Sequence, residues 1–207
     1  TFQTLIREAK KIGARVSAIP LKTDFSFDLK LMKKALTSET SMIYLVNPNN
    51  PTGTHLDFED IRNFCTSLPK ETIVFLDEAY SHFLEDTRGR DGITLIKQGY
   101  NVIVSRTFSK VYGLAGMRLG YAIAKPSIIR KLKAFSFRNM GNNQAVFAGG
   151  LASLEDEKHA EKYIELVKEG REFYFNEFNS LGLNYISGTA PFIMAKVNMP
   201  SKLAKKN

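Results

Sequence analysis

The feature that most constrains the fold is a series of short apolar runs that alternate with stretches of helical periodicity. The expected strands cover residues 15–20, 41–46, 72–78, 101–107 and 118–124. Strands that are apolar throughout are typical of a sheet covered on both faces, and their alternation with helices is typical of parallel pairing. The sequence therefore predicts an α/β fold with a mainly parallel sheet flanked by helices.

Helical patterns fill the intervals between these runs and dominate the end of the chain. They cover residues 3–13, 28–37, 57–68, 126–135 and 142–179. Asp28 and Asp57 are the expected N-caps of the second and third helices. Two further short strands are expected at residues 183–186 and 192–197. Because the strand–helix alternation stops near residue 126, we predict one domain over residues 1–125 and a second region over residues 126–207.

Composition limits the class of protein. The chain has 207 residues, 43% of them hydrophobic, which suffices for a buried core and is too high for a disordered chain. No apolar run approaches the roughly 18 residues of a membrane span. The single cysteine, Cys65, excludes an internal disulfide and fits a reducing compartment. We expect a cytoplasmic protein without membrane contact, although a targeting segment before Thr1 stays open because the chain does not begin with Met.

The net charge of +8 has two interpretations. The lysines are scattered along helical stretches, with one short cluster in residues 201–207, and this pattern favours solvated helix faces. A nucleic-acid site would need a clustered basic patch with interleaved aromatic residues, which the sequence does not show. We therefore expect no nucleic-acid partner, whereas an anionic ligand or cofactor agrees with the sign of the charge.

Polar residues follow three of the expected strands directly. They are residues 47–53, 77–80 and 107–110. Because the carboxyl ends of parallel strands meet at one edge of a sheet, and ligands of such sheets bind there, we expect these residues to form one site.

Asp77 and Lys110 are the two unusual charges at this edge. A carboxylate that follows an apolar strand needs a partner, so Asp77 either caps a helix, pairs with a neighbouring cation or holds a positive charge on a ligand. Desolvation disfavours the ammonium form of a lysine and makes its amine a better nucleophile. Lys110 is therefore either a reactive amine or a lysine whose head reaches water.

Arg118 and two hydroxyl groups supply the chemistry of an anion site. A guanidinium matches a phosphate with two parallel hydrogen bonds, and Thr107 and Ser109 flank the lysine with hydroxyls that suit the same anion. An arginine that simply starts a strand and pairs with a carboxylate is the alternative. Neither a metal-ligand cluster, a Ser-His-Asp order nor a glycine-rich nucleotide motif occurs, so we expect no metal, hydrolase or dinucleotide site.

Four motifs occur in a fixed order, each at a strand end or start: NPNNPTG, DEAY, SRTFSK and GLAGMRLGY. Together they resemble the fold-type I aminotransferases that use pyridoxal phosphate, and within them the histidinol-phosphate aminotransferase-like branch. The resemblance spans essentially the whole chain. It implies that the predicted sheet is the large, cofactor-binding domain, and that the residues after 126 form connecting helices and part of a smaller α/β domain.

The resemblance also implies roles for individual residues. Lys110 would bind the cofactor aldehyde covalently and then move a proton at the substrate Cα. Asp77 would hold the N–H of the pyridine ring, while Asn50 and Tyr80 would hydrogen-bond the ring oxygen.

The remaining cofactor contacts follow from the same resemblance. Arg118, Ser109 and Thr107 would bind the phosphate. Phe2 falls where the family places an aromatic side chain over the cofactor ring, and it is the expected stacking residue.

Family members are considerably longer than this chain, which affects what the 207 residues do alone. The resemblance implies that the chain lacks an N-terminal part with a strand between residues 15–20 and 41–46, and a C-terminal part with the arginine that binds the substrate carboxylate. A sheet without an inner strand leaves backbone groups unpaired. We therefore expect the 207 residues alone to fold poorly and to turn over no substrate.

The expected function is that of a pyridoxal-phosphate-dependent aminotransferase. It would move an amino group between an amino acid or amino-alcohol phosphate and a 2-oxo acid. A decarboxylase or lyase on the same fold, and a truncated non-catalytic remnant, are the alternatives. The implied partners are the small-molecule amino donor and the 2-oxo acid acceptor, and the resemblance implies a homodimer.

Overall fold

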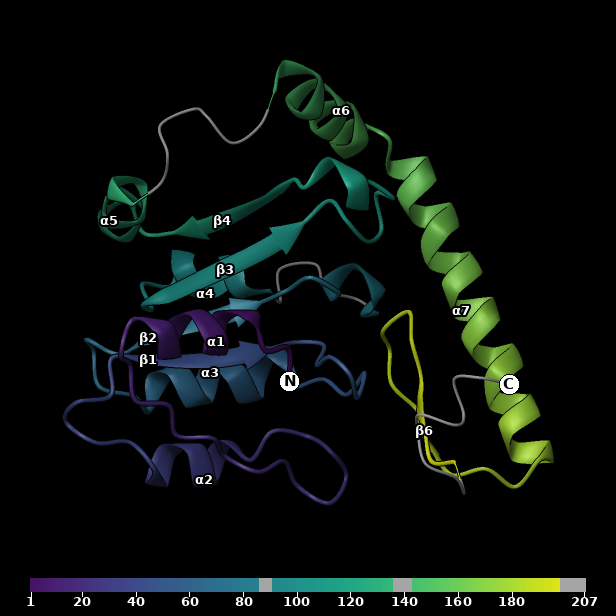
Figure 1. The fold of residues 1–207 in the computed structure, drawn as a ribbon, viewed down its shortest axis with the longest axis horizontal. Coiled ribbons are helices and arrows are strands. Elements are labelled where there is room, and N and C mark those ends of the chain that lie inside the picture. Colours follow the sequence, from purple (N-terminus) through teal and green to yellow (C-terminus); the bar gives the residue numbers. More distant parts are fainter. Residues whose placement is uncertain (86–90, 136–142, 198–207) are drawn as a thin grey trace.

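A four-stranded sheet forms the centre of the computed structural model, which describes residues 1–85, 91–135 and 143–197 (Figure 1). The strand order is β1-β2-β3-β4, with bounds Met42–Val46, Ile73–Asp77, Val102–Thr107 and Gly120–Ala124. β1, β2 and β3 pair in parallel, and β4 runs antiparallel to β3 at the edge. The structure thus confirms the mainly parallel α/β sheet and four of the five strands expected around it.

Residues 15–20 form no strand, so the fifth prediction is wrong. A strand exists only where its backbone groups pair with a neighbour, and this segment pairs with none of the strands described. Most of it is also exposed to solvent, including Val16. The alternating apolar residues therefore lack a surface to pack on, and the pattern alone does not produce the structure.

Helices surround the sheet. Those within residues 1–125 are α1 (Thr4–Lys11), α2 (Leu29–Lys34), α3 (Phe58–Thr66) and α4 (Gly92–Lys97), with short 3₁₀ turns η1 (Ser81–Phe83) and η2 (Ala115–Met117). Asp28 caps α2 as expected, because its carboxylate accepts from the Leu31 N–H at 2.8 Å. Asp57 occupies the N-cap position of α3 but its side chain makes no capping bond there. Helix α4, which Asp91 caps, was not expected from the sequence.

The largest core lies between the sheet and helices α3 and α4. Leu45, Leu76 and Val104 from three strands meet Phe64 of α3 and Leu95 of α4 there, and all five are buried. Burial of a large aliphatic side chain stabilises a fold by about 1.5–3 kcal/mol. This core therefore fixes the three parallel strands, and with them the loops at their carboxyl ends.

The C-terminal part of the described chain is mostly helical, as expected. Its elements are α5 (Pro126–Ala134), α6 (Gln144–Glu155), α7 (Glu157–Ser180), β5 (Tyr185–Ile186) and β6 (Met194–Ala195). β5 and β6 form a short antiparallel hairpin. Figure 1 shows α7 running past the ends to which β1 and β3 point, with the hairpin beside it. The division of the chain at residues 125 and 126 stays a prediction.

No helix in the described ranges is both long enough and apolar enough to span a membrane.

Candidate functional site

Three of the four motifs meet at the carboxyl ends of the parallel strands. Asn50 follows β1, Tyr80 follows β2, and Lys110 follows β3. The side-chain amide of Asn50 donates to the Tyr80 hydroxyl at 3.2 Å, and the Lys110 Nζ lies 5.2 Å from the centre of the Tyr80 ring. The structure therefore brings together an amine, a phenol and an amide that are up to 60 residues apart in sequence, counting from Asn50 to Lys110.

Asp77 ends β2 at the same edge. Its carboxylate accepts from the Tyr44 hydroxyl at 3.3 Å and from the Ala79 N–H at 3.2 Å. Burial raises the pKa of Asp77, while hydrogen bonds from Ser105, Ala79 and Tyr44 oppose this shift. Within the described residues Asp77 caps no helix and forms no ion pair, so neither structural alternative accounts for it. Its role as the partner of a cation on a ligand therefore stays a prediction for this half-buried carboxylate.

The raised pKa of Asp77 predicts a pH dependence of stability. The folded state favours the neutral carboxyl group of Asp77, which therefore adds to the free energy of unfolding. This contribution is fully present below pH 3.8, the usual pKa of an aspartate, and is lost as the pH rises through the raised pKa of the folded state. We expect Asp77→Asn, which is neutral at every pH, to remove this loss. Urea unfolding of the complete gene product without cofactor, measured across the acid range, tests it. Asp60→Asn on the exposed side of α3 is the matched control, and equal curves for both variants would contradict the prediction.

Lys110 lies in a tight loop. The Gly113 N–H donates to the Lys110 carbonyl at 2.9 Å, and the Leu114 N–H donates to the Phe108 carbonyl at 3.0 Å. Gly113 has φ +67°, a conformation that glycine adopts without strain. At the start of the loop the Ser109 N–H donates to the Thr107 hydroxyl at 3.1 Å. These bonds fix the backbone that carries the lysine.

Arg118 does not begin a strand, which corrects the sequence analysis. It follows η2 in a left-handed conformation with φ +53°, and β4 begins only at Gly120. Position 120 favours glycine, because a Cβ there would lie 2.9 Å from the Arg106 carbonyl oxygen. The Arg118 guanidinium is exposed and donates to the Ala115 carbonyl at 2.8 Å. The structure shows no hydrogen bond from it to Ser109 or Thr107, so the shared phosphate contact stays a prediction.

Phe2 is the least enclosed of the expected site residues. Its side chain is 47% exposed, and the described rings include none that contacts it. Its stacking role stays a prediction.

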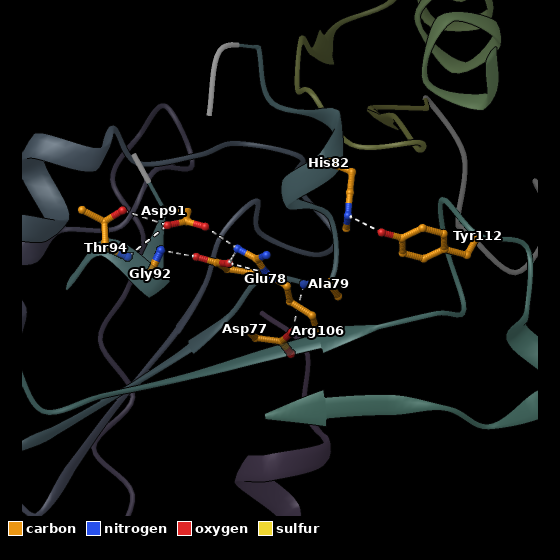
Figure 2. A network of polar contacts seen from close by, with 9 residues as sticks. All are labelled: Asp77, Glu78, Ala79, His82, Asp91, Gly92, Thr94, Arg106 and Tyr112. Atoms are coloured by element: carbon orange, nitrogen blue, oxygen red, sulfur yellow. Dashed lines mark hydrogen bonds and ion pairs between the residues drawn. The ribbon is translucent and has the colours of Figure 1, made fainter. Parts of the chain in front are cut away.

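A buried charge network beside this site was missed by the sequence analysis (Figure 2). Arg106 of β3 donates to the Glu78 carboxylate from Nε at 2.9 Å and from Nη2 at 2.7 Å, and to Asp91 at 2.7 Å. The other oxygen of Glu78 accepts from the Gly92 N–H at 2.7 Å. The signal was present in the sequence, since Arg106 interrupts an apolar strand, but its partners come from two other segments.

The network ties three elements together at the site edge. Burial disfavours the guanidinium, but Glu78 and Asp91 outweigh it and raise the pKa of Arg106, which therefore stays charged. Asp91 also caps α4 through the Thr94 N–H at 3.0 Å. The ends of β2 and β3 that carry Asp77 and Thr107 are thereby held to the start of α4.

A second feature missed by the sequence analysis is the C-terminal segment 188–192, which packs on the site. The Phe192 ring meets the Tyr80 ring edge-on, with centres 5.0 Å apart and an angle of 85°. The Thr189 N–H donates to the Gly53 carbonyl at 3.0 Å. Local spacing gives no sign of this contact because the two residues are 136 positions apart.

The contact between the two segments depends on a pair of glycines. A Cβ added at Gly188 would lie 2.6 Å from both Cα and C of Gly53, which is closer than van der Waals contact allows. We expect Gly188→Ala to push segment 188–192 away and to cost about 1–3 kcal/mol of unfolding free energy, measured in urea. Gly170→Ala on α7 is the control, because nothing lies within 4 Å of its added Cβ. A Gly188→Ala protein as stable as this control would contradict the expectation.

A cavity of about 550 Å³ lies next to the charge network. Glu78, Asp91 and Arg171 are among its lining residues, whereas Lys110, Asp77 and Tyr80 are not. The candidate site is therefore identified by the side chains that converge at the strand ends, an amine, a phenol, an amide and a carboxylate, and not by this cavity.

Known proteins match this chain over nearly its whole length. A histidinol-phosphate aminotransferase of Caldicellulosiruptor saccharolyticus is 39% identical over 91% of this chain and 52% of the relative. The solved histidinol-phosphate aminotransferase of Sinorhizobium meliloti, in complex with pyridoxal-5'-phosphate, is 28% identical with a TM-score of 0.86, over 99% of this chain and 55% of that one. A solved decarboxylase of Sulfurospirillum multivorans is 26% identical with a TM-score of 0.76, over 92% of this chain and 57% of that one.

The chain thus spans about half the length of the curated relatives it matches. The family model described as aminotransferase class I and II matches residues 1–206. With this match and the sheet topology in agreement, the chain belongs to the class I and II aminotransferase family.

Proposed function

We propose that the protein is a pyridoxal-phosphate-dependent aminotransferase that moves an amino group between an amino acid or amino-alcohol phosphate and a 2-oxo acid. The observation that carries the proposal is the Lys110 amine facing the Tyr80 ring at the edge where Asp77 and Asn50 also lie. The similarity of the chain to histidinol-phosphate aminotransferases supports an amino-alcohol phosphate as one substrate.

The donor set fits the chemical groups of pyridoxal phosphate. An amine can bind its aldehyde, a mostly buried carboxylate can hold its ring N–H, and a phenol with an amide can hydrogen-bond its ring oxygen. These groups are Lys110, Asp77, Tyr80 and Asn50. When bound, the cofactor supplies an electron sink for the carbanion left by removal of the substrate Cα proton.

Each residue of the chain has a distinct task in this proposal. The Lys110 amine would hold the cofactor through its aldehyde, and once free it would move the proton at the substrate Cα. Asp77 would keep a positive charge on the ring nitrogen, and that opposite charge would in turn favour its ionised form. Tyr80 is held for its hydrogen bond by Asn50 and by the edge of Phe192.

The phosphate would be bound by Ser109, Thr107 and Arg118, with Phe2 against the ring. Ser109 and Thr107 are neighbours at the start of the lysine loop, where the Ser109 N–H donates to the Thr107 hydroxyl at 3.1 Å. Arg118 would exchange its present bond to the Ala115 carbonyl for a charge-assisted bond to the phosphate, which is the stronger of the two.

The decarboxylase of Sulfurospirillum multivorans favours a second candidate on the same fold. Both reactions use the same residues around the cofactor, and they differ in which bond at the substrate Cα breaks. Release of carbon dioxide from an amino acid, without an acceptor, would support decarboxylation. Amino transfer that needs a 2-oxo acid and releases no carbon dioxide would support the aminotransferase.

The test uses the complete gene product with added pyridoxal phosphate. We expect the absorbance band of lysine-bound cofactor, and amino transfer from histidinol phosphate or an amino acid to 2-oxoglutarate. A folded protein that shows no such band at saturating cofactor would overturn the proposal and favour the non-catalytic remnant.

We further propose that the protein acts as a homodimer in the cytoplasm, with its small-molecule donor and acceptor as partners. Membership of the class I and II family supports the dimer and the substrates. Sedimentation equilibrium of the loaded protein would show twice the mass of one chain.

A further inference from the structure

Two contacts of matching spacing join the turn after β2 to the lysine loop. The first is Lys110 Nζ at 5.2 Å from the centre of the Tyr80 ring. The second lies two residues further along each segment, where His82 Nε2 and the Tyr112 hydroxyl are 3.2 Å apart (Figure 2). The His82 and Tyr112 rings also meet edge-on, with centres 5.3 Å apart and an angle of 80°. The function proposed above uses the first contact and not the second.

Both segments are short turns with internal backbone hydrogen bonds. A displacement of the backbone at one residue therefore also displaces it two residues away. The Phe83 N–H donates to the Tyr80 carbonyl at 3.1 Å in the first turn. In the loop, the Gly113 N–H donates to the Lys110 carbonyl at 2.9 Å. A bond that fixes Tyr112 relative to His82 therefore also fixes where the backbone of Lys110 lies relative to Tyr80.

Apolar packing shields the second contact from water in part, since His82 and Tyr112 are both half-buried. Phe83 and Val111 are the neighbours of His82 and Tyr112 in sequence, and both are buried in one cluster. The Tyr112 ring also packs on Phe108, with centres 5.2 Å apart. Losing this hydrogen bond has a cost, because half-buried groups regain bonds to water less readily than exposed ones.

The bond does not need a charged imidazole. Burial lowers the pKa of His82, and the charge of Arg106 lowers it further, so His82 is neutral near pH 7. A neutral imidazole nitrogen and a phenol hydroxyl form a hydrogen bond with either group as the donor.

We propose that His82 and Tyr112 are a positioning pair, which holds the lysine loop so that the Lys110 amine faces Tyr80. The inference rests on the proposed function, since it requires Lys110 to be the amine that binds the cofactor. Neither residue touches the reacting atoms in this scheme. Their effect comes through the loop backbone, and it sets how readily Lys110 reaches the cofactor aldehyde.

The experiment is a double-mutant cycle on the complete gene product. Tyr112→Phe and His82→Phe each keep a ring and remove the bond, and the double variant removes both groups. The readouts are the rate constant with which added pyridoxal phosphate attaches to the protein, followed by absorbance, and the circular dichroism of the bound-cofactor band. We expect each single variant to slow attachment about fivefold, and the double variant to be no slower than either.

Two further variants separate positioning from loss of fold. His82→Gln places a polar group where Nε2 lies and should restore the rate to within about twofold of wild type, together with the circular dichroism of the band. Tyr100→Phe removes another hydroxyl bond, to Thr66 at the end of α3, and should match wild type in both readouts, because Tyr100 precedes β3 and the lysine loop follows it.

The outcomes distinguish this inference from the function on which it rests. Three results would each overturn the positioning pair alone. They are single variants that attach the cofactor at the wild-type rate, a double variant slowed by the sum of the two single effects, and a His82→Gln variant as slow as His82→Phe. A folded wild type that attaches no cofactor would overturn the proposed function, and the pair with it.

Discussion

Lys110→Ala should abolish covalent binding of pyridoxal phosphate and reduce amino transfer roughly 10³-fold or more. The proposal gives this amine two tasks, attachment of the cofactor and proton movement at the substrate Cα. Proton transfer by a positioned side chain alone contributes roughly 10²–10⁴-fold to a rate. The measurements are reduction of the loaded protein with borohydride followed by mass determination, and the initial rate of amino transfer.

The matched control is Lys131→Ala, which removes an exposed lysine from α5. This variant should keep both the added mass of the cofactor and the wild-type rate. A Lys110→Ala protein that still gains the mass after borohydride treatment would place the attachment at another lysine.

Arg106→Met should lower the free energy of unfolding by about 3–5 kcal/mol, the usual cost of removing one partner from a buried ion pair. The substitution leaves the carboxylates of Glu78 and Asp91 beside each other without their cation. Glu78 is the more affected, because it is only 5% exposed. Urea unfolding of the complete gene product at pH 7 measures the loss. At acid pH the loss should shrink, because both carboxyl groups then take up protons.

Arg15→Met provides the comparison at the surface. Arg15 pairs with Glu39, but both side chains are exposed, and such a pair contributes only about 0–1 kcal/mol. If the two arginine variants lost equal stability, the network around Arg106 would not hold the sheet as described.

Much of the fold could be predicted because its elements have local signals. The strands β1 to β4 each contain an apolar run, and the C-terminal helices lie in a long stretch free of proline, so single-sequence patterns suffice. Residues 15–20 carry the same kind of signal but find no partner strand, and pairing is not a local property. Helix α4 was missed for a related reason. Its start depends on Asp91 as a cap and on Gly92, where a Cβ would lie 2.5 Å from Val104 Cγ2, so the position is set by packing.

The centre of the site was predictable because the topology of parallel strands brings loop residues together. Asn50, Tyr80 and Lys110 follow three strands, and the structure joins them as the strand ends imply. The surroundings were not predictable in the same way. Phe192 reaches Tyr80 from the far end of the described chain. Arg118 was expected at a strand start, whereas the 3₁₀ turn before it holds it in a left-handed conformation.

The bond from Thr189 to Gly53 also bears on how the protein is made. The two residues are separated by 136 positions, so the loop that carries Asn50 leaves the ribosome long before the segment that covers it. Synthesis proceeds at about 5–20 residues per second, which leaves the loop uncovered for several seconds or longer. During that interval the parallel strands have their core partners from α3 and α4, but Tyr80 lacks the ring of Phe192. Segment 188–192 therefore covers the candidate site only after the sheet that supports it has been made.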